Sequence, residues 1–145
     1  MVEIHAAQRL MATDTMSFET LVKKIESFLG TKGEDHGDLV VFEKVDREGL
    51  AYVVTVAPQN GKDVRVDAWF GLISSVIADG GHLTGNTEDD CWKFLNVNKT
   101  GKPAAVLKEF QKSAKRGLIE ADHLIKSLEG DIKLVKDAKK MLSKL

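Results

Sequence analysis

The sequence contains a single cysteine, Cys91, among 145 residues. One cysteine can form no disulfide within the chain and cannot supply the thiolates of a structural zinc site. Long apolar runs are missing as well, since the longest uncharged apolar stretch, residues 68–78, falls far short of the roughly 18–20 residues of a membrane span. The first residues lack a basic segment followed by an apolar run, so they predict no signal peptide. These absences favour a soluble, cytoplasmic protein with no membrane partner.

The sequence has no large excess of positive or negative charge, since its net charge is -1 at pH 7. Hydrophobic residues make up 43% of it. A disordered chain would have fewer apolar residues and a larger net charge, so residues 1–145 are expected to form a single domain. Residues 1–98 nevertheless contain 9 Lys and Arg against 16 Asp and Glu, whereas residues 99–145 contain 12 against 6. We therefore distinguish an acidic α/β body, 1–98, from a basic helical segment, 99–145.

Residues 39–70 have the pattern of an antiparallel meander. Three runs rich in Val and aromatic residues, 39–45, 50–57 and 63–70, are separated by turn sequences, of which Asn60-Gly61 is the strongest. The middle run is apolar on both faces, which predicts a central strand. The predicted fold class is α+β: a three-stranded antiparallel meander packed with N-terminal helices and a helical C-terminal third.

The clearest helical pattern covers residues 18–29, with Ser17 placed to cap its start and Gly30 to end it. Weaker patterns predict short helices at residues 4–11, 72–77 and 87–95. From residue 100 onward the chain is predicted to be helical to its end, with Pro103 in the first turn.

From Leu118 the apolar residues recur at spacings of three and four, which resembles the seam of a coiled coil. Gly130 and Asp131 can interrupt this seam, so one long helix and a helical hairpin both remain open. The first functional hypothesis is a non-catalytic protein-interaction or assembly module that packs a partner protein, or another copy, onto the seam. Its predicted partner-binding residues are Leu118, Ile125, Leu128, Ile132 and Val135.

The alternative hypothesis is a nucleic-acid-associated protein that uses the lysine-rich C-terminal helices. A break at Gly117 would even create a helix-turn-helix. Only one of the twelve C-terminal cations is an arginine, however, and the would-be recognition helix begins with acidic residues, so we expect weak binding. The predicted contact residues are Lys133, Lys136, Lys140 and Lys144. Packing of the helices on the sheet, with solvated lysines outside, explains the same pattern.

Three segments contain candidate metal ligands: Glu34–Asp38, Asp79–His82 and Glu88–Cys91. None has a committed spacing such as His-x-x-x-His or Cys-x-x-Cys, and turns or a helix start explain each of them. Three carboxylates directly before Cys91 oppose formation of its thiolate. Nucleophile-elbow and phosphate-loop motifs are missing. We predict no metal, no cofactor and no identifiable catalytic residue; a small enzyme with a dispersed active site is the third hypothesis.

The opening residues, His5–Ala12, resemble the N-termini of some tailed-bacteriophage virion and accessory proteins. The resemblance covers these residues alone. It implies a small viral protein that works by binding, located in the virion or the host cytoplasm, and it transfers no functional residue.

Overall fold

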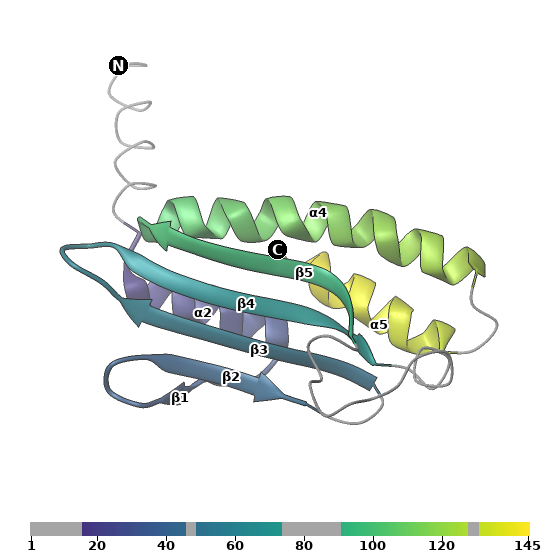
Figure 1. Cartoon of the computed structure of the whole chain (residues 1–145), viewed down its shortest axis with the longest axis horizontal. Coiled ribbons are helices and arrows are strands. Elements are labelled where there is room, and N and C mark those ends of the chain that lie inside the picture. Colours follow the sequence, from purple (N-terminus) through teal and green to yellow (C-terminus); the bar gives the residue numbers. More distant parts are fainter. Residues whose placement is uncertain (1–15, 46–48, 74–90, 128–130) are drawn as a thin grey trace, which may run out of the picture.

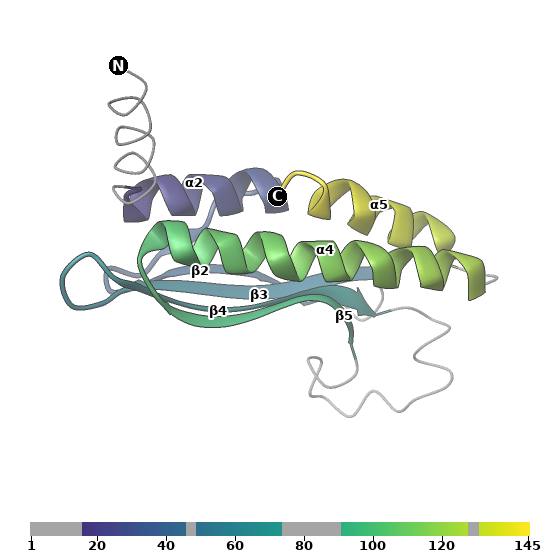
Figure 2. The ribbon, with the colours of Figure 1, turned by 90° about the horizontal axis from the view of Figure 1, so that it is seen from above.

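The computed structural model describes residues 16–45, 49–73, 91–127 and 131–145. In these residues three helices lie on one face of a five-stranded antiparallel sheet with the order β1-β2-β3-β4-β5 (Figures 1 and 2). The α+β class is therefore confirmed, with five strands in place of three. The elements are α2 (Phe18–Leu29), β1 (Glu34–Asp35), β2 (Val40–Lys44), β3 (Gly49–Pro58), β4 (Val64–Ile73), β5 (Trp92–Gly101), α4 (Pro103–Ser127) and α5 (Ile132–Leu142).

The predicted meander corresponds to β2, β3 and β4, and β3 is the central strand of the sheet. Val54 of β3 pairs with Phe42 of β2 and Ala68 of β4. Val54 is fully buried beneath the helices, whereas its neighbour Val53 points to the other face and is partly buried. Both faces of β3 thus carry apolar side chains, as the sequence predicts.

Strand β5 corrects two predictions, because residues 92–95 and 100–101 are extended rather than helical. Leu95 and Val97 are buried, while Asn96 and Asn98 are exposed, which is the alternation of a strand with one covered face. The register shifts at Phe70 and Gly71 of β4, so that Phe94 is an additional residue in β5. Phe94 and Leu95 are both buried as a result, and this break in the alternation hides the strand in the sequence.

Two further segments differ from their predictions. Leu72 and Ile73 end β4 instead of starting a helix. The segment Glu34–Asp38, for which the sequence indicates a turn, also contains the strand β1, and Gly37 in its turn has φ +88°. The predicted helix at residues 4–11 and the remainder of those at 72–77 and 87–95 lie outside the described residues.

The core lies between the sheet and the helices, with Phe70 of β4 near its centre. The ring of Phe70 lies 5.2 Å from Phe28 of α2, 6.4 Å from Tyr52 of β3 and 6.5 Å from Phe94 of β5. These four rings connect one helix to three strands. Helix α2 begins and ends as predicted.

The ends of α2 confirm the predicted caps. Ser17 Oγ accepts a hydrogen bond from the backbone N–H of Thr20 at 3.1 Å. Gly30 takes the left-handed conformation, φ 71°, and its N–H donates to the carbonyl oxygen of Glu26.

Helix α4 runs without interruption through Gly117, so the predicted break and the helix-turn-helix are wrong. A Cβ atom at Gly117 would lie 1.9 Å from the carbonyl oxygen of Phe94 in β5. Glycine is therefore needed here because the helix backbone approaches the strand closely, not because the helix ends. Ser113, one turn earlier, joins the same two elements: its Oγ accepts from Asn96 N at 3.0 Å and lies 3.4 Å from Asn96 O, to which it donates.

Helices α4 and α5 pack side by side as a hairpin, which decides between the two arrangements left open by the sequence (Figure 1). Helix α5 also contacts β3 and β4, and it lies nearly in line with α2 along one side of α4 (Figure 2). The C-terminal helices therefore cover the sheet. The boundary between acidic and basic residues at 98–99 falls inside β5.

Candidate binding groove between α4 and α5

The predicted partner-binding residues that the structure describes are buried or partly buried on the two C-terminal helices. Val135 is fully buried in the core, and Leu118 and Ile125 are partly buried against it. Ile132 is also partly buried, and Leu128 lies outside the described residues. The apolar surface of Val135 is already used within the chain, so a partner has access mainly to the residues at the margins of the seam.

One of these margins forms a groove of about 750 Å³ between α4 and α5. Helix α4 contributes residues 122, 125 and 126, α5 contributes residues 136, 139 and 140, and residue 143 follows directly after α5. In both sets the positions follow the i, i+3, i+4 spacing of a single helix face. The groove is lined by Asp122, Ile125, Lys126, Lys136, Lys139, Lys140 and Ser143.

Positive charge dominates this groove. Lys139 Nζ donates to Asp122 Oδ1 at 2.5 Å, and this hydrogen bond lowers the pKa of the Asp122 carboxyl below its ordinary value of 3.8. In the part of the chain that the structure describes, the side chains of Lys136 and Lys140 make no ion pair or hydrogen bond. Their ammonium groups are therefore available to a negatively charged partner.

The lysines of the nucleic-acid hypothesis are all exposed. Lys136 and Lys140 line the groove, whereas Lys144 donates to the backbone oxygen of Ser27 at 3.4 Å and borders a separate hollow of about 360 Å³ beside α2. Lys133 lines neither hollow. Of the four lysines predicted to contact nucleic acid, the structure therefore places two, Lys136 and Lys140, in the groove.

Sequence reasoning missed Lys126 and Lys139 as groove residues. In an antiparallel hairpin, moving one turn forward along α4 corresponds to moving one turn back along α5. Since Asp122 contacts Lys139, the next turn of α4, with Lys126, comes level with the preceding turn of α5, with Lys136. The spacing of these two lysines is visible in the sequence, but it assigns them to a groove only once the two helices are known to form a hairpin.

The excess of positive charge belongs to the helical layer as a whole. Helices α2, α4 and α5 contain 11 Lys and Arg against 6 Asp and Glu, whereas the five strands contain 4 against 4. The groove is therefore part of a basic side of the molecule, opposite the open face of the sheet.

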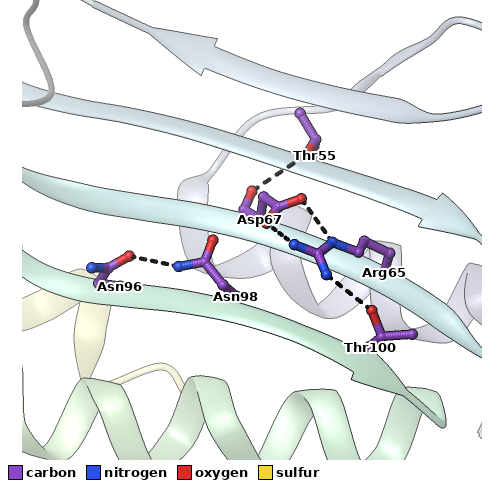
Figure 3. Close-up of polar contacts among 6 residues, drawn as sticks. All are labelled: Thr55, Arg65, Asp67, Asn96, Asn98 and Thr100. Carbon is purple, nitrogen blue, oxygen red and sulfur yellow. Dashed lines mark hydrogen bonds and ion pairs between the residues drawn. The ribbon is translucent and has the colours of Figure 1, made fainter.

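The open face of the sheet carries a polar network from three strands (Figure 3). Arg65 donates to both carboxylate oxygens of Asp67, at 3.2 and 3.0 Å, and to Thr100 Oγ1 at 3.3 Å. The side chains of Arg65 and Asp67 are 48% and 45% exposed. Because the guanidinium group neutralises the carboxylate, this ion pair offers a partner little net charge. The network comprises Thr55, Arg65, Asp67 and Thr100, and a separate hydrogen bond on the same face joins Asn98 to Asn96.

The candidate metal ligands are only partly within the described residues. His36 Nε2 lies 3.4 Å from Glu34 Oε2 on the surface, and Cys91 packs against a small apolar cluster of the open face that includes Trp69. Residues 79–82 and 88–90 are outside the described ranges. Among the described residues, no group of three or more His, Cys, Asp and Glu is placed to hold a metal ion. The absence of a metal and of a catalytic thiol stays a prediction.

None of the described helices combines the length and the apolar character needed to cross a membrane. Comparison of the chain with protein-family models, curated proteins and solved structures found no significant match. The resemblance of residues 5–12 to phage proteins stays a prediction, and these residues lie outside the described ranges.

Proposed function

We propose that this protein works by binding rather than by catalysis, as an assembly or protein-interaction module whose contact surface is the groove between α4 and α5. The observation that carries the proposal is that Ile125 and lysines from both helices line the same hollow. A partner in this groove contacts an apolar side chain and several positive charges together.

The charge of the groove indicates the class of partner. Among the described residues that line it, the only carboxylate belongs to Asp122 and is ion-paired with Lys139, so the remaining lysines favour a protein surface with clustered carboxylates. The exposed large apolar side chains of the described residues, Val45, Trp92 and Ile119, come from three different regions and none lines the groove. Charge therefore contributes more to recognition here than an apolar patch does.

The test is a pair of lysine variants with the same change in charge. The groove variant replaces Lys136 and Lys140 by glutamine, and the control replaces Lys108 and Lys115, which are exposed on α4 outside the groove. Self-association is measured by sedimentation velocity, and binding of a labelled polyglutamate peptide by fluorescence anisotropy. Two lost exposed ion pairs should weaken binding about two- to thirtyfold in the groove variant.

The control should bind as the parent does. The proposal is refuted if the groove variant and the parent associate equally, or if the parent neither self-associates nor binds the acidic peptide. Circular dichroism of each variant establishes that the fold is intact.

Nucleic-acid association is the second candidate, and the observation in its favour is the row of exposed lysines that runs along α5 and just beyond its end. Binding of a labelled duplex oligonucleotide should then weaken with salt at a slope near -0.9 per neutralised phosphate. Glutamine at these positions should abolish it with the fold intact. A strict monomer with tight, salt-sensitive oligonucleotide binding would place this candidate above assembly. The row is Lys133, Lys136, Lys140 and Lys144.

A further inference from the structure

The groove and the most acidic exposed turn of the described chain lie at opposite ends of the molecule. The groove is formed by the C-terminal half of α4 and by α5, at one end of the long axis (Figure 1). The turn between β1 and β2 lies at the other end, beside the edge of the sheet that is farthest from α4 (Figure 1). The turn of one molecule therefore cannot reach the groove of the same molecule.

The tip of this hairpin is a fixed, negatively charged projection. Residues Glu34–Asp38 contain three carboxylates, and all five residues are exposed. Asp35 Oδ1 accepts a hydrogen bond from Gly37 N at 2.8 Å, and His36 N donates to Leu39 O at 2.9 Å. These bonds close the turn, and Gly37 supplies the positive φ that the turn requires.

The charges of tip and groove are complementary. Three carboxylates project from the tip, and four lysines line the groove, where one of them is already paired with Asp122. Lys136 and Lys140 have no ion-pair partner in the described part of the chain. A turn held in shape by its own hydrogen bonds loses little conformational entropy on docking.

We infer that the β1–β2 hairpin tip of one copy docks in the α4–α5 groove of a second copy, head to tail. The inference rests on the proposed function of the groove and names its occupant. Each such contact leaves one tip and one groove unoccupied, so a third copy can add and the assembly is open rather than closed. Because the contact consists of exposed charges, raising the ionic strength toward about 1 M should dissociate it.

The test uses two neutralised variants. The tip variant replaces all three carboxylates by amides, and asparagine at position 35 keeps a side-chain oxygen that can accept the turn hydrogen bond. The groove variant leaves Lys139 in place, because this residue holds Asp122. The tip variant is Glu34→Gln, Asp35→Asn and Asp38→Asn, and the groove variant is Lys126→Gln, Lys136→Gln and Lys140→Gln.

Sedimentation velocity at low ionic strength should show that the parent grows beyond the dimer with increasing concentration. Each variant alone should be monomeric, with association weakened at least about tenfold. An equimolar mixture should give a one-to-one dimer that grows no further, because the tip variant keeps its groove and the groove variant keeps its tip.

Two control variants carry the same changes in charge at other exposed or half-exposed positions of the helices, and both should associate like the parent. They are Glu19→Gln with Glu109→Gln and Glu120→Gln, and Lys108→Gln with Lys112→Gln and Lys115→Gln.

The outcomes separate this inference from the function on which it rests. A tip variant that associates like the parent, while the groove variant does not, overturns the hairpin as occupant but leaves the groove as the binding surface. A mixture that stays monomeric, or a parent that stops at a dimer, also overturns the head-to-tail contact. A groove variant that associates like the parent contradicts both the head-to-tail contact and the proposed function of the groove.

Discussion

The two faces of the sheet are built from alternate residues of the same strands, yet their side chains differ in how far they are buried. In β4, Val64 and Val66 are at most 1% exposed beneath the helices, whereas Arg65 and Asp67 next to them are about half exposed on the open face. The covered face holds the aromatic core that joins α2 to the sheet. Most of the free energy of folding should therefore depend on the covered face, while substitutions in the exposed polar network of the open face should be tolerated.

The largest expected contrast is between Val54→Asp and Val53→Asp. Val54 is fully buried, so an aspartate there places an unpaired charge in the core and should cost more than about 4 kcal/mol, enough to unfold a domain of ordinary stability. Val53 is partly exposed on the open face, where the carboxylate keeps part of its hydration, and we expect a loss of about 1–2 kcal/mol. Thermal unfolding followed by circular dichroism measures both, and equal melting temperatures would remove the contrast between the faces.

A smaller effect is expected for Gly117→Ala in α4. At an exposed helical position, alanine in place of glycine stabilises by about 1 kcal/mol. Here the new methyl group meets the carbonyl oxygen of Phe94, so the helix must move away from β5, and we expect a net loss of about 1–3 kcal/mol. Urea denaturation gives the sign, with Lys115→Ala on the exposed side of α4 as the control. A more stable Gly117→Ala variant would show that the close approach is not required.

Ser113→Ala should cost about 0.5–1.5 kcal/mol, because it removes the hydrogen bonds to both backbone groups of Asn96. Hydrogen exchange should be faster at the Asn96 amide than in the parent. Ser143→Ala, directly after α5, is the matched control, since the Ser143 hydroxyl donates to the backbone oxygen of Lys139 in the adjacent helix and not to the sheet. Unchanged exchange at Asn96 would contradict the role assigned to Ser113.

The smallest effect concerns the open face itself. Arg65→Gln removes an ion pair whose two side chains are nearly half exposed, and solvent screens such a pair. We expect the melting temperature to match that of the parent within error. A loss as large as that of Ser113→Ala would mean that the polar network of Figure 3 supports the fold, and would weaken the contrast between the two faces.

The parts of the fold that local patterns determine could be predicted from the sequence. Helix α2 has a continuous apolar face with a serine and a glycine at its ends, and β2 to β4 are separated by recognisable turns. The buried residues follow a period of 3.6 in α2, and a period of 2 in the middle of β3 and in the first half of β4. No knowledge of distant contacts is needed to place them.

The remaining elements depend on contacts between distant residues. The additional residue Phe94 in β5 is explained by the register shift opposite Phe70 and Gly71 of β4. The glycine at position 117 is explained by the close approach of α4 to the carbonyl oxygen of Phe94. Of the residues that line the groove, Ile125 belongs to the predicted partner-binding set, and Lys136 and Lys140 belong to the alternative nucleic-acid set. Lys126 and Lys139 could not be assigned, because the facing sides of α4 and α5 follow from the hairpin and not from either helix alone.

The contact between Ser113 and Asn96 has a consequence for aggregation. Among the described strands β5 is the last of the sheet, and the backbone groups of such a strand can pair with a strand of another molecule. At Asn96 both the N–H and the carbonyl oxygen are already engaged by the Ser113 hydroxyl. Helix α4, which carries half of the groove, therefore also prevents another chain from extending the sheet at this point.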